Sequence, residues 1–354
     1  MKLRLLNIAL IYFLFVPSCI DPLDFSKDDD SKSLVVDGWI TNEPGPYFVY
    51  LERTSDYNSS SSQTEKVEGA IIFISDDMGN SEILLETYVP GIYKTDPDGI
   101  RGIPGRYYKI EIETLDGEHY ESMPELLHPV PEIDTIYYER QQHQELDDNS
   151  IVQTFEGFQI YIDTSDPENV NNYYMWSWGG THEVHTQPWN YWDPHFFRLA
   201  PKDCCPTCWV TERPRQLDVF NDVLLGGDQI NKKPVAFVRI KNINGTRHFH
   251  GKYHVEVKQL SLTKEAYNYW STIKEQISST GSIFEPPPVA IIGNIENCEN
   301  PEDIAFGYFG ASAISTKSIF IPASAAPYPP GDTLVWPDDC RMMGNSTAIK
   351  PSFW

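Results

Sequence analysis

Basic residues are scarce in this sequence: 27 Lys and Arg stand against 51 Asp and Glu, for a formal net charge of −24 over 354 residues. Phosphate backbones attract basic patches, so a chain of this charge is poorly suited to nucleic-acid binding. Long apolar runs are missing as well. The apolar stretch from Leu5 to Val16 is interrupted by Asn7 and is shorter than the about 20 residues that span a bilayer.

The common catalytic and metal-binding motifs are also missing. The sequence has no Gly-x-Ser-x-Gly nucleophile elbow and no glycine-rich phosphate loop. One Cys-x-x-Cys, from Cys205 to Cys208, has no second copy to complete a four-ligand zinc site. Acidic pairs are so frequent that choosing one as a hydrolytic dyad would be arbitrary. We therefore expect no enzyme, no cofactor and no metal.

The first 18 residues read as a lipoprotein signal peptide. Lys2 and Arg4 precede the apolar stretch, and Val16-Pro17-Ser18-Cys19 places a cysteine where a lipoprotein signal peptidase cuts. Pro17 departs from the small residue that is commoner there. We expect a diacylated Cys19 and a lipid-anchored protein; the alternative is an ordinary secreted protein whose Cys19 joins a disulfide.

Residues 19–33 form an acidic tether with five aspartates, Asp21, Asp24, Asp28, Asp29 and Asp30. Such a segment buries little surface and is expected to be extended and solvated. It resembles the acidic surface-export signal behind the lipidated cysteine of Bacteroidota lipoproteins. The expected location is the outer membrane, on the cell surface; the alternative is a plain spacer on a periplasm-facing protein.

Five cysteines remain if Cys19 carries lipid, and an exported protein meets an oxidising compartment. They are disulfide candidates: Cys204, Cys205, Cys208, Cys298 and Cys340. An odd number predicts two disulfides with one free thiol, or an intermolecular bond. We expect the cluster at residues 204–208 to bridge to Cys298 and Cys340, with partners unassigned.

Residues 34–128 are predicted to form an immunoglobulin-like or transthyretin-like β-sandwich. Short alternating segments such as Leu34–Ile40 and Tyr107–Glu113 are separated by turn residues at intervals typical of sandwiches. Pro129 and Pro131 then mark a stiff linker.

Residues 129–354 are predicted to form a second β-sandwich, so the expected fold class is mainly β. The polar tract 141–149 is taken as a loop, and Tyr174, Trp176 and Trp178 share one strand face as core residues. A single helix over 263–279 is expected, with Thr263 as its cap. Its apolar stripe follows helical spacing: Ala266, Tyr269, Trp270, Ile273 and Ile277.

The segment 188–194 is the best candidate for a ligand-binding surface. Pro188 and Pro194 hold it in a loop that carries Trp189, Tyr191 and Trp192. Flat rings provide contact area at low entropic cost. The alternative, and the commoner fate of aromatic side chains, is that they fill a gap between the domains or under the cysteine cluster. The histidines His182, His185, His195, His248, His250 and His254 could bind a transition metal if folding paired them, but we expect separate surface or loop histidines.

Five segments carry a family resemblance: residues 34–41, 267–270, 288–295, 307–312 and 350–354. Together they resemble the Bacteroidota outer-membrane lipoproteins of the domain of unknown function 4249 family. The resemblance implies an outer-membrane lipoprotein of a kind often encoded beside TonB-dependent receptors, and it carries no catalytic residues. We expect a non-catalytic accessory or ligand-binding partner of such a transporter. The alternatives are a stand-alone glycan- or peptide-binding lipoprotein using residues 188–194, or a weak hydrolase with perturbed carboxylates or histidines in a cleft.

Overall fold

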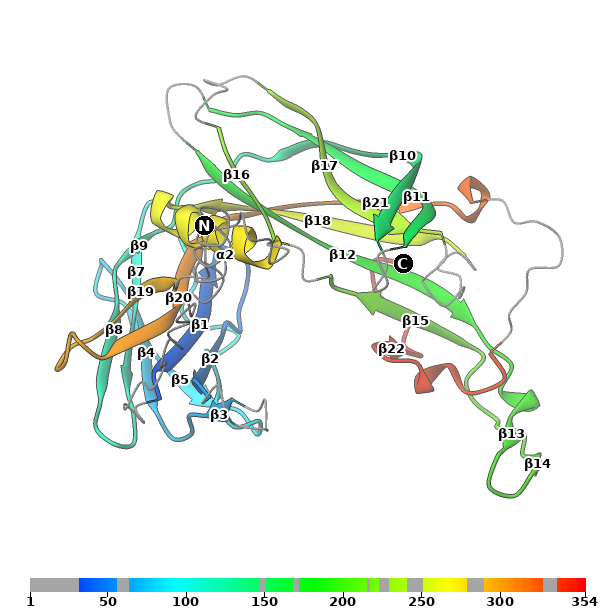
Figure 1. The fold of residues 1–354 in the computed structure, drawn as a ribbon, viewed down its shortest axis with the longest axis horizontal. Helices are drawn as coiled ribbons and strands as arrows, with labels where there is room; N and C mark the ends of the chain where they lie inside the picture. The colour runs from blue at the N-terminus through cyan, green and yellow to red at the C-terminus, as the bar shows by residue number, and fades with distance from the viewer. Residues whose placement is uncertain are drawn as a thin grey trace, which may run out of the picture. The chain divides into compact units, whose positions relative to one another are not determined.

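A computed structural model describes residues 32–55, 64–146, 151–167, 172–214, 217–222, 229–240, 251–278, 290–326 and 336–354. The predicted signal peptide, Cys19 and most of the acidic tether lie outside the described residues, as do His248 and His250. Residues Ser33–Trp354 form one compact unit. The described part is mainly β, as expected, with one α-helix (Figure 1).

The first sheet closes on itself. Its strands are β1 (Leu34–Thr41), β2 (Phe48–Arg53), β3 (Glu65–Lys66), β4 (Ile71–Asp76), β5 (Ser81–Glu86), β6 (Ile92–Lys94), β7 (Tyr107–Glu113), β8 (His119–Ser122), β9 (Glu125–Leu126), β19 (Ile292–Asn297) and β20 (Ile304–Ser312). Nine of them form a ring in the order β1, β20, β19, β8, β7, β4, β5, β6, β2, which returns to β1. The prediction of two β-sandwiches is therefore wrong for this part.

Closure of this sheet depends on a long-range parallel pairing. β20 pairs in parallel with β1, from Val35 opposite Phe306 to Thr41 opposite Ser312. Gly307 has φ +92°, and a Cβ on it would lie 1.8 Å from the backbone oxygen of Val36. Only glycine tolerates this backbone conformation and this close approach. Two strands from the later part of the chain thus complete a sheet that begins at Leu34, and the predicted boundary at residues 128/129 marks only a change of sheet.

Two further sheets enclose a second core. Three strands form one of them: β10 (Ile133–Leu146), β11 (Val152–Thr164) and β17 (Ile230–Arg239). Six form the other: β21 (Ile314–Ile321), β18 (Tyr253–Leu262), β12 (Tyr173–His185), β15 (Thr207–Glu212), β22 (Ser346–Thr347) and β16 (Asp218–Asn221). Phe158 and Ile160 from the first, and Trp176 and Val255 from the second, are at most 1% exposed in this core. Burial of such side chains from water is the main stabilising contribution.

The polar tract at residues 141–149 is not wholly a loop. Through Leu146 it continues β10, pairing with β11 from Gln141 opposite Gly157 to Leu146 opposite Val152. Polar side chains suit this position because the strands form a ribbon with solvated faces, where Arg140 pairs with Glu156 at 3.0 Å. A polar stretch without alternation predicts a loop, but the residues through Leu146 form a strand because they pair with β11.

The predicted helix is confirmed as α2 (Lys264–Ser278). Thr263 caps it, accepting a hydrogen bond on Oγ1 from the Ala266 N–H at 3.1 Å. Ala266 is buried, and Trp270 stacks on Trp39 of β1 with ring centroids 6.0 Å apart. Ile277, predicted to pack on the sheet, is 75% exposed. Among the described residues, no helix is long and apolar enough to cross a membrane.

Candidate functional site

The predicted aromatic loop is a short hairpin inserted between β12 and β15. After β12 ends at His185, the chain makes a 3-10 turn, η2 (Pro188–Asn190), and then the two strands β13 (Trp192–Asp193) and β14 (Arg198–Leu199). Pro188 occupies the start of the turn, where its fixed φ is suitable. Tyr173, at the start of β12, contacts Tyr267 of α2. The hairpin follows the opposite, C-terminal end of β12 (Figure 1).

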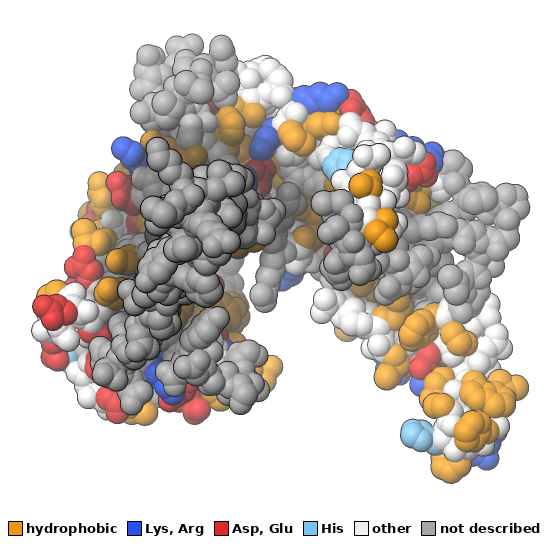
Figure 2. All heavy atoms as spheres, viewed as in Figure 1, with side chains coloured by type: hydrophobic (Ala, Val, Ile, Leu, Met, Phe, Trp, Pro, Cys, Tyr) orange, Lys and Arg blue, Asp and Glu red, His pale blue; other side chains and the backbone are white. Residues whose placement is uncertain are grey.

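Large apolar side chains gather on this hairpin and face solvent. The exposed fractions are 53% for Trp189, 50% for Trp192, 71% for Phe196, 78% for Phe197 and 63% for Leu199. We call these five residues the apolar tip (Figure 2). Exposed apolar clusters of this kind mark interaction sites more often than scattered apolar residues do. The alternative that Trp189 and Trp192 fill an internal gap does not agree with their exposure.

Tyr191, the third predicted binding residue, has a different environment from the two tryptophans. The Nζ of Lys202 lies 3.8 Å from its ring centroid, a cation–π contact. The same Nζ donates to Asp338 at 2.5 Å. The Tyr191 ring is thus held at the base of the hairpin rather than displayed with the apolar tip. Phe196, Phe197 and Leu199 lie just beyond the predicted segment 188–194, and they join the two tryptophans in the apolar tip.

Disulfides hold the base of the hairpin. Cys208, at the start of β15, is bonded to Cys340, 132 residues away, and the neighbours Cys204 and Cys205 are bonded to each other. The Cys340 N–H also donates to the Cys205 carbonyl at 3.1 Å. The bridge from the cluster to Cys340 is as expected. The expected bridge to Cys298 is wrong: its thiol is free and exposed, because it follows β19 in the closed sheet.

A carboxylate reinforces the same base. Asp339 caps the 3-10 turn η4 (Cys340–Met342), accepting on Oδ1 from the Arg341 N–H at 2.9 Å. It also accepts from the Arg341 guanidinium, with Nη2 at 2.6 Å from Oδ2. These hydrogen bonds to Arg341 hold the pKa of Asp339 well below its usual range. The charge stays in place over ordinary pH and fixes the turn that carries Cys340.

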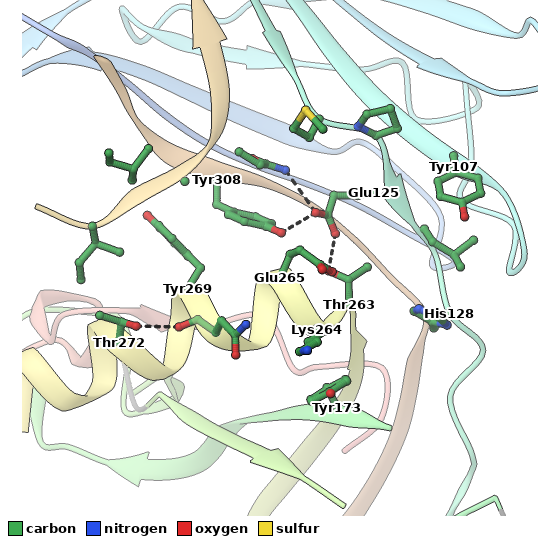
Figure 3. Close-up of a pocket in the computed structure, with 18 of the residues that line it drawn as sticks. Tyr107, Glu125, His128, Tyr173, Thr263, Lys264, Glu265, Tyr269, Thr272 and Tyr308 are labelled. Atoms are coloured by element: carbon green, nitrogen blue, oxygen red, sulfur yellow. Dashed lines mark hydrogen bonds between the residues drawn. The ribbon is translucent and has the colours of Figure 1, made fainter. Parts of the chain in front are cut away.

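A second candidate site is a cavity of about 860 Å³ between the closed sheet and α2 (Figure 3). Its volume lies within the about 300–1,000 Å³ of small-molecule sites. Tyr107 lies at its rim with 45% exposure, and Tyr269, Asn294 and Tyr308 line its interior. Apolar and polar groups alternate on the wall, so the cavity suits a small, partly polar ligand.

Glu125 is the buried carboxylate of this cavity, at 4% exposure. Its Oε1 accepts from the Tyr308 hydroxyl and from Asn294, and its Oε2 accepts from the Thr263 hydroxyl at 2.7 Å. Burial raises the pKa of Glu125, and these donors lower it in part. Since Thr263 caps α2, the carboxylate ties the helix to the closed sheet (Figure 3).

Glu125 and Thr263 orient each other in the wall of the cavity. Both oxygens of Glu125 accept hydrogen bonds, and the Thr263 hydroxyl both donates to Glu125 and accepts from Ala266. Burial raises the pKa of Tyr269 to about 12 and lowers the pKa of His128, so Tyr269 stays neutral and a hydrogen-bonding role suits both rings.

The cavity was not predicted from the sequence, yet signals for it were present. Three of the segments that carry the family resemblance meet there: residues 267–270 supply Tyr269, 288–295 supply Asn294, and 307–312 supply Tyr308. Glu125 gave no signal of its own, because it is one of many acidic residues in an acidic chain.

The described histidines do not form a metal centre. His182 is 3% exposed and stacks on Tyr253 at 5.4 Å between ring centroids, while His254 stacks on Phe353 at 4.3 Å. His185 lies 3.0 Å from Glu183. Within the described ranges, the one group of three or more residues with metal-ligand spacing is Cys204, Cys205 and Asp339. Its two sulfurs are bonded to each other, which leaves no thiolate for a metal.

Fold and sites together define a mainly β protein with an exposed apolar hairpin and a cavity between a closed sheet and a helix. A family model described as a domain of unknown function, DUF4249, matches residues 20–318. The chain therefore belongs to the DUF4249 family. None of the curated proteins matches it.

Proposed function

We propose that this protein is a non-catalytic, lipid-anchored binding protein of the outer-membrane surface, an accessory of a TonB-dependent receptor. The apolar tip is the observation that carries the binding role, because Trp189, Trp192 and Phe196 are each at least half exposed. Leaving such rings in water costs free energy unless a partner covers them. Aromatic residues are also the side chains that dominate binding energy at protein interfaces.

The attachment of the hairpin supports a docking role. The apolar tip stands on a base fixed by the Cys208–Cys340 disulfide and by the contacts of Lys202. A rigid base lowers the entropic cost of binding, since fewer side chains and less backbone become ordered on contact. In this proposal the cavity near Glu125 holds the ligand that the protein presents, and the apolar tip contacts the receptor. Cys19 supplies the anchor.

Gentle detergent extraction tests the receptor partnership. The wild-type protein is expected to co-purify with a TonB-dependent receptor, whereas Trp189→Ala/Trp192→Ala is expected to lose it while keeping its melting temperature. A matched control is Leu85→Ala/Tyr88→Ala, which removes side chains 66% and 98% exposed in the closed sheet and its turn. Absence of any receptor from the wild-type preparation would sink the proposal.

A second candidate function is direct recognition of a glycan or peptide by the apolar tip. The observation that favours it is the presence of flat rings on a two-stranded hairpin, where stacking on a sugar or a peptide side chain is sterically open. The two functions are distinguished by binding of the purified protein to glycan and peptide arrays. Tip-dependent binding without a receptor in the detergent extract favours the second.

A further inference from the structure

Two buried carboxylates meet where three strands of the second core end. Asp166 follows β11 and is 6% exposed, and Asp222 follows β16 and is 3% exposed. The Asp222 N–H donates to the carbonyl of Asn172 at 3.2 Å, just before β12 begins. Neither the proposed receptor contact nor the cavity near Glu125 involves this pair.

Each carboxylate of the pair has one buried oxygen without a hydrogen-bond donor among the described residues. Asp166 Oδ1 accepts from the Tyr174 hydroxyl at 2.9 Å and from Asn172 Nδ2 at 3.3 Å. Asp166 Oδ2 and Asp222 Oδ1 are buried, and neither has a hydrogen-bond donor in the described structure. No Lys, Arg or His among the described residues forms an ion pair with either carboxylate. Unpartnered buried oxygens are rare in native proteins and require an explanation.

The two carboxylates also act on each other. Burial raises the pKa of Asp166, and the contact with Asp222 raises it further. An ionised carboxylate accepts hydrogen bonds but donates none, so two of them in contact repel each other in a site that is already poorly solvated. Either a shared proton or a bound cation would remove this repulsion and occupy the two free oxygens.

A carboxylate elsewhere in the fold shows what the pair lacks. Asp303 Oδ2 accepts from the Tyr120 hydroxyl at 3.0 Å and from Asn297 Nδ2 at 2.8 Å. Asp166 has the same two types of donor, a tyrosine and an asparagine. Asp303 has no orphaned buried oxygen in the described structure. Asp166 therefore resembles Asp303 in its hydrogen-bond donors and differs from it in having Asp222 as a neighbour.

We propose that Asp166 and Asp222 bind a calcium ion through Asp166 Oδ2 and Asp222 Oδ1. Calcium is a hard cation that takes oxygen ligands and accepts flexible geometry, with water in the remaining positions. Zinc would prefer nitrogen or sulfur ligands, and neither element lines the pair. The ion ties the ends of β11 and β16 to the start of β12, the strand that leads to the apolar tip. Two protein carboxylates predict an affinity in the range of about 10⁻⁴–10⁻³ M, typical of extracellular calcium modules.

Terbium luminescence and thermal unfolding of the full chain test this site. Tb³⁺ bound at Asp166 is expected to be sensitised by Tyr174, whose hydroxyl lies 2.9 Å from that carboxylate, and to be displaced by Ca²⁺. Ca²⁺ at about ten times its Kd is expected to raise the melting temperature by about 2–5 °C relative to EDTA. Asp166→Asn and Asp222→Asn are each expected to abolish both responses. Asp303→Asn, the matched control, is expected to keep them.

The shared-proton alternative gives the opposite results. In that case the wild-type protein has the same melting temperature in Ca²⁺ and EDTA, and Asp222→Asn is stabilised at neutral pH in both, since its amide can donate to Asp166 without the uptake of a proton. Either result overturns the calcium site. If Asp166→Asn fails to fold, the wild-type comparison and Asp222→Asn still decide the question, because Asp222 does not accept the tyrosine and asparagine hydrogen bonds.

Discussion

Two groups of aromatic side chains belong to the same part of the chain and have opposite environments. Tyr174 and Trp176 on β12 are each 1% exposed, whereas Trp189 and Trp192, in the hairpin that follows β12, are 53% and 50% exposed. Strand β12 alternates its side chains, so the first group faces the three-stranded sheet. The hairpin has only two strands, and among the described residues no second sheet packs over it. Aromatic content alone therefore does not distinguish core from surface; the neighbouring layer does.

The largest expected effect comes from the buried group. Trp176→Ala removes a buried ring whose Nε1 donates to Gln259 at 3.0 Å, and it leaves both a cavity and an unpaired polar group. We expect a loss of about 3–5 kcal/mol in the free energy of unfolding, measured by urea denaturation. Trp189→Ala is the control, with an expected change below about 0.5 kcal/mol. Equal losses would contradict the contrast between the two groups.

The disulfide at the hairpin base gives the next largest effect. Replacing Cys208 and Cys340 together by Ser opens a link between residues 132 positions apart and is expected to cost about 2–4 kcal/mol. Hydrogen exchange should quicken around residues 186–206 before it quickens in β12. Cys298→Ser, at the free thiol, is expected to change stability by less than about 0.5 kcal/mol. A uniform increase in exchange would show that the bridge does not act on the hairpin.

A pH-dependent effect is expected at the same base. Because Arg341 lowers the pKa of Asp339 in the folded protein, the stabilisation from this carboxylate is fully present above the unfolded value near 3.8 and is lost as the pH falls below it. The difference in unfolding free energy between wild type and Asp339→Asn should therefore be largest at pH 7 and should shrink below pH about 4. A difference that grows on acidification would reverse the assigned sign.

The smallest effect on stability is expected within the apolar tip itself. Phe197 has φ +47°, a left-handed conformation that asparagine adopts more readily than a bulky residue. Phe197→Asn should leave the free energy of unfolding unchanged or raise it by up to about 1 kcal/mol, while weakening the interaction with the receptor. Loss of stability in thermal unfolding would mean that the Phe197 ring packs within the protein.

Local features of this fold follow from the sequence, whereas its closure does not. Strict alternation in Tyr107–Glu113 predicts β7 with the bounds that the structure has. Thr263 as a cap, together with the helical spacing of Ala266 and Trp270, predicts α2. The parallel pairing of β1 with β20 joins residues more than 260 positions apart, and no local pattern encodes it. That pairing converts an expected sandwich into a closed sheet.

The candidate sites also divide into one that local sequence predicts and others that depend on long-range contacts. Two prolines flanking Trp189 and Trp192 predict an aromatic loop at residues 188–194, but not the two strands that the structure forms there. Phe196 and Phe197 lie outside that bracket and were missed. The cavity near Glu125 and the Asp166–Asp222 pair arise where distant strands meet. A carboxylate's burial depends on the tertiary structure, so an acidic sequence gives no means of choosing among its many acids.

Photocrosslinking in the native outer membrane tests the proposed contact between the apolar tip and a TonB-dependent receptor. p-Benzoylphenylalanine at Phe196, a ring 71% exposed, changes the side chain little and places the reactive group in the proposed contact. Irradiation should give a covalent adduct with a TonB-dependent receptor, and the same probe at Tyr88 should give none. Adducts from both positions at equal yield, or none from Phe196, would contradict the claim.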